Sequence, residues 1–331
     1  MQTKNLLIGM TYDLREDYLA EGYSLEETAE FDKPDTIEAI EQSLQELGFR
    51  TERIGNAKAL VQALASQRRW DMVFNIAEGM FGVGREAAVP ALLDTYQIPY
   101  TFSDPAVLTI ALDKALTKSI VRDAGVATAP FACLHTPADI SRVTLPFPLF
   151  LKPLAEGTGK GISNRSRVQN PAELHAVATE LLAQFHQPVL VETFLPGREF
   201  TVGLAGAGDN AEVLGLIEVN FHAGSGEIYS YQTKADYESL VSYSVPQDAV
   251  AREAAQVALA AWRALRCVDA GRADIRCDAA GRPNFIEVNP LAGLNPTHSD
   301  LPILCRLNGI SFTQLIARIM RNACQRHGLI G

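Results

Sequence analysis

Two patterns of apolar and polar residues, short apolar runs and helical spacing, alternate along the first hundred positions of the chain. Short apolar runs at residues 6–9 and 72–76 are typical of buried strands. Between them, apolar residues recur at helical spacing over 37–47, with Asp35 as the expected N-cap and Gly48 as the stop signal. The same pattern predicts strands at 50–54 and 99–102 and helices at 57–68 and 85–96. Such alternation predicts an α/β unit with a parallel sheet flanked by helices.

A long stretch at residues 10–34 separates the first predicted strand from the first predicted helix. It is rich in acidic side chains and also contains four aromatic residues, Tyr12, Tyr18, Tyr23 and Phe31. Long loops in compact domains are commonly either functional or disordered. The aromatic residues favour a segment that packs on a ligand or a partner.

The pattern changes from residue 106 onwards. A predicted helix at 106–124 ends at Gly125, and a proline-bounded strand at 147–152 opens what we expect to be a small domain. Beyond Gly197 the pattern turns mainly to strands. The other predicted elements are helices at 171–185, 248–265 and 313–322 and strands at 188–192, 199–204, 213–220, 271–277 and 284–289. At roughly 150 residues per domain, a chain of 331 residues suits about two domains.

Composition and charge exclude several classes of protein. An apolar share of 47% is usual for a chain with a buried core, which argues against disorder. The apolar runs are far shorter than the ~20 residues of a membrane span, and the amino end lacks a secretory apolar region, so we expect a cytoplasmic protein. A net charge of −10 and the lack of a basic run argue against nucleic-acid and membrane partners. The five cysteines show no Cys-x-x-Cys spacing, so we expect buried thiols rather than a zinc site or disulfides.

The strongest chemical signal is a predicted β-hairpin whose turn is centred between residues 280 and 281. This centre places Asp274 opposite Glu287 and Arg272 opposite Asn289. Alternate residues share a face of the sheet, and directly opposed residues have Cβ atoms ~5 Å apart. Two carboxylates and an amide oxygen this close repel each other unless a cation lies between them, and such ligands suit Mg²⁺. The alternative is a solvated face on which the arginines form salt bridges.

Two further segments carry weaker signals. Glycines at 156–161 let backbone amides approach an anion, and Lys152 before the loop and Lys160 within it can neutralise phosphate charge. The loop lacks the Gly-Lys-Ser/Thr ending of a Walker loop, so an ordinary turn between strands is the alternative. Glu192 and Glu199 flank an apolar turn and could accept hydrogen bonds from an adenine amino group and a ribose hydroxyl, although surface glutamates are common.

Taken in order, these motifs resemble the ATP-grasp superfamily, and within it the D-alanine–D-alanine ligase family, along nearly the whole chain. The resemblance implies an α/β ATP-grasp fold: an N-terminal Rossmann-like (pre-ATP-grasp) domain with a parallel sheet, followed by two α+β ATP-binding subdomains. The implied division is a substrate domain at 1–105, a central subdomain with a phosphate lid at 106–192, and a C-terminal subdomain with the metal and catalytic site at 193–331.

The resemblance also implies roles for named residues. Lys114 and Lys152 would contact the nucleotide phosphates, whereas Arg272 and the backbone amide of Gly293 would steady the reaction intermediate. Lys234 lies in a segment similar to the family's mobile loop and would reach the terminal phosphate. The other implied ATP contacts are Glu156, Gly157, Thr158, Gly159 and Gly161 in the lid and Glu192, Phe194, Leu195 and Glu199 around the nucleoside. The implied metal ligands are Asp274, Glu287 and Asn289, which would hold two Mg²⁺ ions, with Mn²⁺ as an alternative.

Elementary chemistry agrees with these implied roles. A carboxylate does not react with an amine at neutral pH, because its leaving group would be an oxide ion. Transfer of the terminal phosphoryl group of ATP gives an acyl phosphate, from which the amine can displace phosphate. The protein must supply Mg²⁺, cationic side chains and amide donors where negative charge develops. We find no convincing Ser-His-Asp or Cys-His arrangement in the sequence, and His298 suits substrate contact and plain packing equally well.

This sequence differs from the family mainly in the segments with which the family recognises D-alanine. The long stretch 10–34 replaces a short loop with a glutamate that receives the first amino acid's ammonium group. Residues 75–79 stand where the family has a histidine and glycines. The second-substrate segment, 293–302, is one residue longer than in the family, and Asp300 within it would repel a carboxylate unless it turns away. The candidate substrate contacts are Glu78, Tyr231 and Ser299.

The leading hypothesis is an ATP-dependent carboxylate–amine ligase that joins amino acids or related small acids through an acyl phosphate and releases ADP and phosphate. A true D-alanine–D-alanine ligase with a drifted sequence is one alternative. A phosphotransferase that uses the same nucleotide site on an alcohol is another, and a non-catalytic nucleotide sensor is a third. The expected partners are small amino-acid or carboxylic-acid substrates, and the resemblance alone favours a homodimer.

Overall fold

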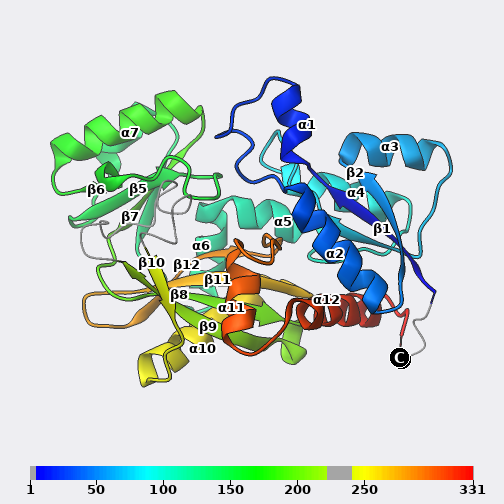
Figure 1. Ribbon diagram of the computed structural model, residues 1–331. Helices are drawn as coiled ribbons and strands as arrows, with labels where there is room; N and C mark the ends of the chain where they lie inside the picture. The colour runs from blue at the N-terminus through cyan, green and yellow to red at the C-terminus, as the bar shows by residue number, and fades with distance from the viewer. Residues whose placement is uncertain (1–4, 222–240, 331) are drawn as a thin grey trace.

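The computed structural model describes residues 5–221 and 241–330 and contains three sheets (Figure 1). Their strand orders are β2-β1-β3, β4-β7-β5-β6 and β10-β9-β8-β11-β12. The segment that resembles a mobile loop, with Tyr231 and Lys234, lies outside the described residues. Within the described ranges, every helix is too short or too polar to cross a bilayer.

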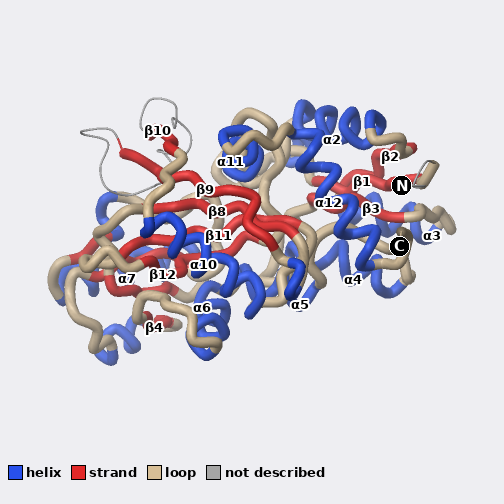
Figure 2. Tube along the Cα trace, turned by 90° about the horizontal axis from the view of Figure 1, so that it is seen from below, coloured by secondary structure: helices blue, strands red, loops and turns tan. Residues whose placement is uncertain are grey.

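The first sheet is parallel, as the alternating pattern predicts. Its strands and the helices around it are β1 (Leu7–Tyr12), α1 (Arg15–Ala20), α2 (Pro34–Glu46), β2 (Arg50–Gly55), α3 (Ala57–Ala65), β3 (Met72–Ile76) and α4 (Ala88–Thr95). Helix α2 and the C-terminal helix α12 (Phe312–Arg326) share one apolar core with β1 and β3, and the two helices lie side by side in both views (Figures 1 and 2). Helices α3 and α4 join a second core with Val73 of β3.

Three predictions around this sheet are wrong in detail. Helix α2 begins at Pro34 after Lys33, not after Asp35, because the fixed φ and missing N–H of proline suit the first helical position. The predicted strand at 99–102 is reduced to one bridge between Val73 and Tyr100. The stretch 10–34 is not one loop, since it includes the end of β1 and helix α1.

The predicted helix 106–124 is two helices, α5 (Pro105–Leu112) and α6 (Lys114–Asp123). Asp113 between them has an extended backbone, and its Oδ1 accepts hydrogen bonds from the amides of Ala115 and Leu116 at 3.0 and 2.9 Å. An aspartate in this position satisfies amide donors that a helix start leaves unpaired. The break places Lys114 at the first position of α6.

The second sheet is antiparallel and carries α7 on one face. Its elements are β4 (Phe131–Leu134), β5 (Leu149–Pro153), β6 (Arg167–Val168), α7 (Pro171–Phe185) and β7 (Val189–Thr193). Leu149, Leu151 and Val191 pack in the core with α7. Because side chains alternate along a strand, Lys152 and Glu192 lie on the opposite face.

The third sheet is also antiparallel. Its elements are β8 (Glu199–Ala205), β9 (Glu212–Phe221), β10 (Val241–Ser244), α10 (Ala249–Ala264), β11 (Ala270–Cys277), β12 (Pro283–Asn289) and α11 (Asp300–Leu307). Helix α10 covers one face of this sheet (Figure 2). Trp262 of this helix packs in one core with Phe200 and Ile275. Helix α11 contacts the other face at β8 and β9, where Leu304 occupies the space that a side chain at Gly203 would need.

The β11–β12 hairpin has the two pairs that the sequence predicts: Asp274 is opposite Glu287, and Arg272 is opposite Asn289. The predicted turn centre is nevertheless half a residue too late, because Cys277 is opposite Pro283. A register shift after Asp274 inserts one extra residue in β12 and restores the predicted pairs. Such a bulge also increases the local twist of the two strands.

Candidate active site

Two cavities adjoin the inner face of the β11–β12 hairpin. The larger has a volume of about 500 Å³ and is lined from the N-terminal segment, the glycine-rich loop and the hairpin. The smaller has a volume of about 110 Å³ and is lined mainly by β5, β7, the segment after β7 and the hairpin. Glu287 lines both cavities, so it marks the point where they meet.

A row of oppositely charged side chains runs through this junction. Lys118 Nζ lies 2.6 Å from Glu192 Oε1, and Lys152 Nζ lies 3.3 Å from Glu192 Oε2. Glu287 Oε2 then lies 3.6 Å from Lys152 Nζ and 3.7 Å from Lys114 Nζ. We call these five residues the lysine–glutamate row. Three cations against two anions leave one positive charge in surplus, which favours an anion such as a phosphate at the junction.

Burial and pairing act in opposite directions on the pKa values in this row. Burial would raise the pKa of Glu192, but Lys118 and Lys152 hold the pKa below its ordinary value. Burial would lower the pKa of Lys152, but Glu192 and Glu287 raise the pKa above its ordinary value. For Lys114 and Lys118 burial prevails and the pKa is lowered. Lys152 is therefore the lysine of the row whose positive charge is held most firmly.

The predicted metal and catalytic residues lie together on the hairpin. Arg272, Glu287 and Asn289 line the larger cavity, whereas Asp274 lines the smaller one. The Asp274 carboxylate pairs with the Arg272 guanidinium and accepts a hydrogen bond from Thr201 Oγ1 at 3.0 Å. The salt bridge expected from the alternative interpretation is therefore present, but the face that carries it lines cavities.

These oxygen donors fit a divalent cation that arrives with a nucleotide. In residues 5–221 and 241–330, three or more His, Cys, Asp or Glu side chains are nowhere grouped so that they alone could hold a metal ion. Asp274 and Glu287 are direct neighbours across the two strands, and Asn289 supplies an amide oxygen two residues further on. Mg²⁺ in phosphate sites is usually held by one or two carboxylates together with phosphate oxygens and water.

The glycine-rich loop is fixed by contacts from two sides. Lys114 Nζ donates a hydrogen bond to the Glu156 carbonyl oxygen at 2.6 Å. Gly161 has φ +72°, and Pro153 occupies the space that a side chain at Gly161 would need. The remaining predicted lid residues, Thr158 and Gly159, line the larger and the smaller cavity respectively. The loop is thus closely packed between α6 and β5.

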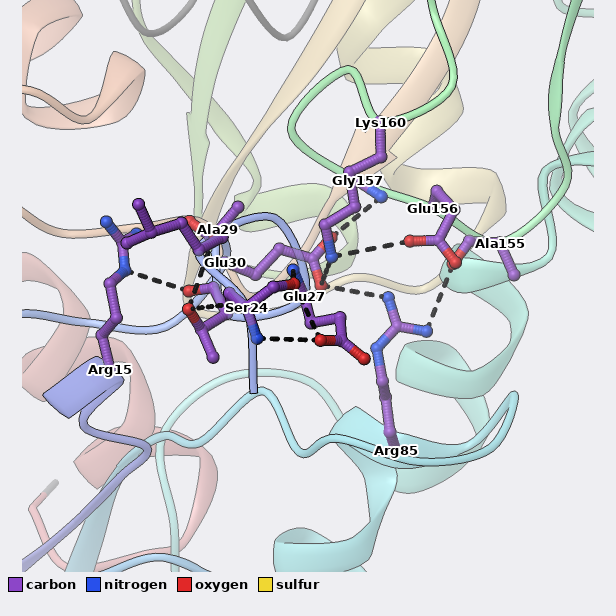
Figure 3. A network of polar contacts seen from close by, with 12 residues as sticks. Arg15, Ser24, Glu27, Ala29, Glu30, Arg85, Ala155, Glu156, Gly157 and Lys160 are labelled. Carbon is purple, nitrogen blue, oxygen red and sulfur yellow. Dashed lines mark hydrogen bonds and ion pairs between the residues drawn. The ribbon is translucent and has the colours of Figure 1, made fainter. Parts of the chain in front are cut away.

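Glu30, from the N-terminal stretch, binds this loop directly (Figure 3). Its Oε1 accepts a hydrogen bond from the Gly157 amide at 2.9 Å, and its Oε2 lies 3.8 Å from Lys160 Nζ. Arg85 Nη2 lies 3.3 Å from the same carboxylate and also donates through Nη1 to the Ala155 carbonyl oxygen at 3.2 Å. Burial would raise the pKa of Glu30, but Arg85 and Lys160 hold the pKa below its ordinary value. The Glu30 carboxylate therefore binds an amide and a lysine that are both suited to binding a phosphate.

Aromatic and charged residues form the smaller cavity. Phe194 is buried, and the guanidinium carbons of Arg167 and Arg276 lie 4.3 and 5.4 Å from its ring centre. Arg276 Nη1 lies 3.0 Å from Glu199 Oε2. Leu195 lines the same cavity. The predicted adenine and ribose residues are thus brought together, but the Glu192 carboxylate is already engaged by two lysines.

The predicted substrate contacts are only partly brought together. Glu78, Ser299 and the Gly293 backbone line the larger cavity, whereas Tyr231 lies outside the described residues. Ser299 Oγ accepts a hydrogen bond from the backbone N–H of Asn295 at 3.0 Å. Asp300 Oδ2 lies 3.7 Å from Arg272 Nε, so its charge is offset by that arginine.

Sequence reasoning missed several of the residues that shape these cavities: Glu30, Arg85, Glu86 and Lys118. Lys118 follows Lys114 by one helical turn, and that spacing on a helix start was the available signal. Arg85 and Glu86 lie in a short 3-10 turn before α4, which the pattern assigned to the helix itself. Glu30 was one acidic residue among many in the stretch 10–34.

We predict that Glu30→Gln loosens the glycine-rich loop, because the amide loses the negative charge that pairs with Arg85 and Lys160. A buried donor that loses its hydrogen-bond partner typically lowers the free energy of unfolding by about 1–3 kcal/mol. Hydrogen exchange of the Gly157 amide should become faster than in the wild-type protein. Glu27→Gln is the matched control, since Glu27 bonds to Ser24 on the same segment. Equal Gly157 protection in both variants would refute the role given to Glu30.

We also predict that the free protein loses stability as the pH rises towards about 8. Burial raises the pKa of Glu86 from 4.5 to about 8, with Arg85 opposing the rise and Glu30 adding to it; Lys114 also faces the carboxyl. A carboxyl group whose pKa is raised in the folded state binds its proton more tightly there than in the unfolded chain. The proton therefore stabilises the fold fully below pH 4.5, and this stabilisation is lost as the pH rises through the folded-state pKa of about 8.

The slope of Tm against pH between 5 and 9 measures this loss. Glu86→Gln should flatten the slope because the amide does not titrate, whereas Glu38→Gln on the exposed side of α2 should keep the wild-type slope. Superimposable slopes for the two variants would contradict the prediction.

Known proteins resemble this chain in sequence. The family model described as D-ala D-ala ligase C-terminus matches residues 120–321. "Uncharacterized protein y4sG" of Sinorhizobium fredii (strain NBRC 101917 / NGR234) is 32% identical over 311 residues, which cover 89% of this chain and 90% of that protein. The D-alanine–D-alanine ligase of Bordetella avium (strain 197N) is 33% identical over 259 residues, which cover 77% and 78% of the two chains.

The fold is also similar to a solved structure. The D-alanine–D-alanine ligase from Bacillus anthracis complexed with ATP has a TM-score of 0.73 and 21% identity, with 98% of this chain and 100% of that chain covered. The ATP-grasp fold predicted from the motifs is therefore confirmed. Together with the sequence matches, these findings show that the chain belongs to the D-alanine–D-alanine ligase family, whose members are ATP-grasp ligases that form carbon–nitrogen bonds.

Proposed function

We propose that this protein joins the carboxylate of one amino acid or small acid to the amine of a second, through an acyl phosphate, with release of ADP and phosphate. The observation that carries the proposal is the lysine–glutamate row at the junction of the two cavities. Its surplus positive charge lies between an apolar slot that suits a nucleoside and a polar cavity that suits the substrates. This is the arrangement that phosphoryl transfer to a carboxylate requires.

In this proposal the smaller cavity takes the nucleoside of ATP. Phe194 and Leu195 contact the adenine, and Glu199 accepts from the ribose. The phosphates lie along Lys152 and Lys114 under the glycine-rich loop. The backbone amides at 156–161 would then exchange the Glu30 carboxylate for phosphate oxygens. Lys234, outside the described residues, is proposed to reach the terminal phosphate.

Asp274, Glu287 and Asn289 are the residues that would hold Mg²⁺. When bound, the ion neutralises phosphate charge and polarises the transferring group. A second ion, and Mn²⁺ in place of Mg²⁺, are part of the proposal. The division at 1–105, 106–192 and 193–331 is proposed to separate substrate binding, the phosphate lid and the catalytic hairpin.

The chemistry needs no protein nucleophile. A carboxylate oxygen of the first substrate attacks the terminal phosphorus while the bond to the ADP oxygen breaks. The amine of the second substrate then attacks the acyl carbon, phosphate leaves, and the ammonium loses a proton. Arg272 and the Gly293 amide, which line the larger cavity, would stabilise the oxyanion formed in this step. The proposal also includes a cytoplasmic location, where ATP and amino acids are available, and assembly as a homodimer.

A screen of ADP release over pairs of L- and D-amino acids and small acids tests this function. D-Alanine comes first, because the relatives named above are D-alanine–D-alanine ligases. Oxygen-18 in the substrate carboxylate should appear in the released phosphate. ADP formation with a stable phosphoester product would indicate a phosphotransferase instead, and AMP with pyrophosphate would exclude an acyl phosphate.

Asp274→Asn should lower kcat/KM by at least about 100-fold, because the amide removes one of two charges that would hold the metal. Asp278→Asn is the control on the same hairpin, since Asp278 lies in the turn and its acceptor oxygen, bonded to the amides of Ala280 and Arg282, is retained. Thermal unfolding should show that both variants fold. Turnover of Asp274→Asn at the level of Asp278→Asn would reject the metal assignment.

A further inference from the structure

One wall of the larger cavity is rich in carboxylates that have no obvious role in phosphoryl transfer. The four residues Glu30, Asp32, Glu78 and Glu86 line this wall, which we call the acidic wall. It belongs to the N-terminal part of the chain. Arg272 and Gly293, which the proposed reaction uses, lie on other segments that line the same cavity.

Glu86 is the most informative member of the acidic wall. Its exposed fraction is 8%, and it lines the cavity. Throughout the part of the chain that the structure describes, no residue forms a hydrogen bond or an ion pair with its carboxylate. Glu78 lies on the same wall and likewise makes no such contact within residues 5–221 and 241–330. Buried carboxylates are normally paired or hydrogen-bonded, so the unpaired, buried Glu86 beside the half-buried Glu78 indicates a missing cation.

Three cations that act on the acidic wall are engaged elsewhere, and Figure 3 shows two of them, Arg15 and Arg85. Lys33 also lines the cavity, but its side chain is exposed. Arg85 is held by Glu30 and by the Ala155 carbonyl oxygen. Arg15 donates from Nε and Nη2 to the carbonyl oxygens of Thr28 and Ala29 at 3.0 and 2.6 Å. Lys114 is held by the Glu156 carbonyl oxygen and by Glu287. None of these three side chains pairs with Glu78 or Glu86.

The charges on the acidic wall therefore do not balance. Arg85 and Lys160 together offset Glu30 and Glu156, because Lys160 Nζ lies 3.8 Å from Glu30 Oε2 and 3.6 Å from Glu156 Oε2. Arg15 acts on Asp32. Glu78 and Glu86 remain, so two negative charges face the cavity when both are ionised. The α-ammonium group of one amino acid supplies a single positive charge. A second positive charge on the substrate would neutralise the other carboxylate.

The protonation behaviour of the two carboxyls supports the same conclusion. Burial raises the pKa of Glu78 well above its ordinary value, and Glu86 and Glu30 raise it further. Burial raises the pKa of Glu86 to about 8; Arg85 and Lys114 oppose this rise from a distance, and Glu30 adds to it. Without a bound cation, protons take the place of the missing positive charge.

We propose that the acidic wall binds a cationic side chain, so that one of the two substrates is a basic amino acid with an ammonium or guanidinium group in addition to its α-ammonium. This inference rests on the proposed ligase function, which supplies the second, anion-binding end of the cavity. A neutral amino acid leaves one carboxylate of the wall uncompensated and binds less tightly for that reason.

Pairs of amino acids that differ in side-chain charge but little in shape test the proposal. Arginine with citrulline, and ornithine with norleucine, serve as probes in both stereochemical forms. Isothermal titration of the full chain at pH 8 should show that the cationic member of one pair binds about tenfold or more tightly than the neutral member. The same titrations with Glu86→Gln should bring the ratio of the two affinities close to one.

Two further variants make the result decisive. Glu78→Gln should also reduce the ratio, and it replaces Glu86→Gln if that variant fails to fold. Glu27→Gln removes a carboxylate from the exposed part of the N-terminal stretch and should keep the wild-type ratio. Equal binding of both members in every pair would overturn the proposal, as would a preference that both Glu78→Gln and Glu86→Gln leave unchanged.

ADP release on the same panel separates this proposal from the ligase function. Turnover with neutral amino acids and no preference for cationic ones would leave the ligase function standing and remove the basic substrate. A charge preference in binding without ADP release from any pair would retain the cation site and remove the ligase function. ADP release that is greatest with a basic amino acid, and that loses this preference in Glu86→Gln, is the result we expect.

Discussion

The lysine–glutamate row is the interaction on which the rest of the site depends. It joins α6 to β7, β5 and β12, so it connects elements from both antiparallel sheets. Such a row is costly to bury, because each ion loses its hydration, and it persists only when every member is paired. Removing one partner of a buried pair typically costs about 3–5 kcal/mol. Because positive and negative side chains alternate, each charge in the row is neutralised by a neighbour. Because the row has one lysine more than it has glutamates, it favours binding of an anion.

Glu30 shows the same principle at the glycine-rich loop. Amides that point outward in a glycine-rich turn, with a lysine nearby, form a place for negative charge whether or not a nucleotide is bound. In this structure a carboxylate from the N-terminal stretch fills that place. The contact holds the N-terminal segment against the loop and gives Arg85 its partner. Phosphate binding and the position of the N-terminal stretch are therefore coupled, because Glu30 and a phosphate compete for the same donors.

How far the sequence predicts this molecule depends on whether the signal is local. Strand β3 and helix α7 have the predicted bounds, since each is a clear apolar run or period with its own end signals. The pairing of Asp274 with Glu287 follows from counting residues from the hairpin turn. The assumed turn centre was half a residue too late, and the bulge in β12 compensates for this difference. Helix α11 was not predicted, because its eight residues are mostly apolar and include Pro302, yet proline is tolerated in a first turn. The contacts of Glu30 with Gly157 and of Lys118 with Glu192 span 127 and 74 positions, and no local pattern specifies them.

The larger cavity is electrically polarised by these distant contacts. Arg272 comes from β11 of the hairpin, whereas Glu78 and Glu86 come from the N-terminal part of the chain, and all three line the cavity. A substrate whose carboxylate must reach a phosphoryl group, and whose positive charge lies elsewhere in the molecule, is oriented by such a field before any specific hydrogen bond forms. The reversed orientation places like charges together at both ends and is disfavoured twice. Orientation of this kind is a large part of what an enzyme without a covalent intermediate on the protein can contribute, because the chemistry then depends on holding two small molecules in line.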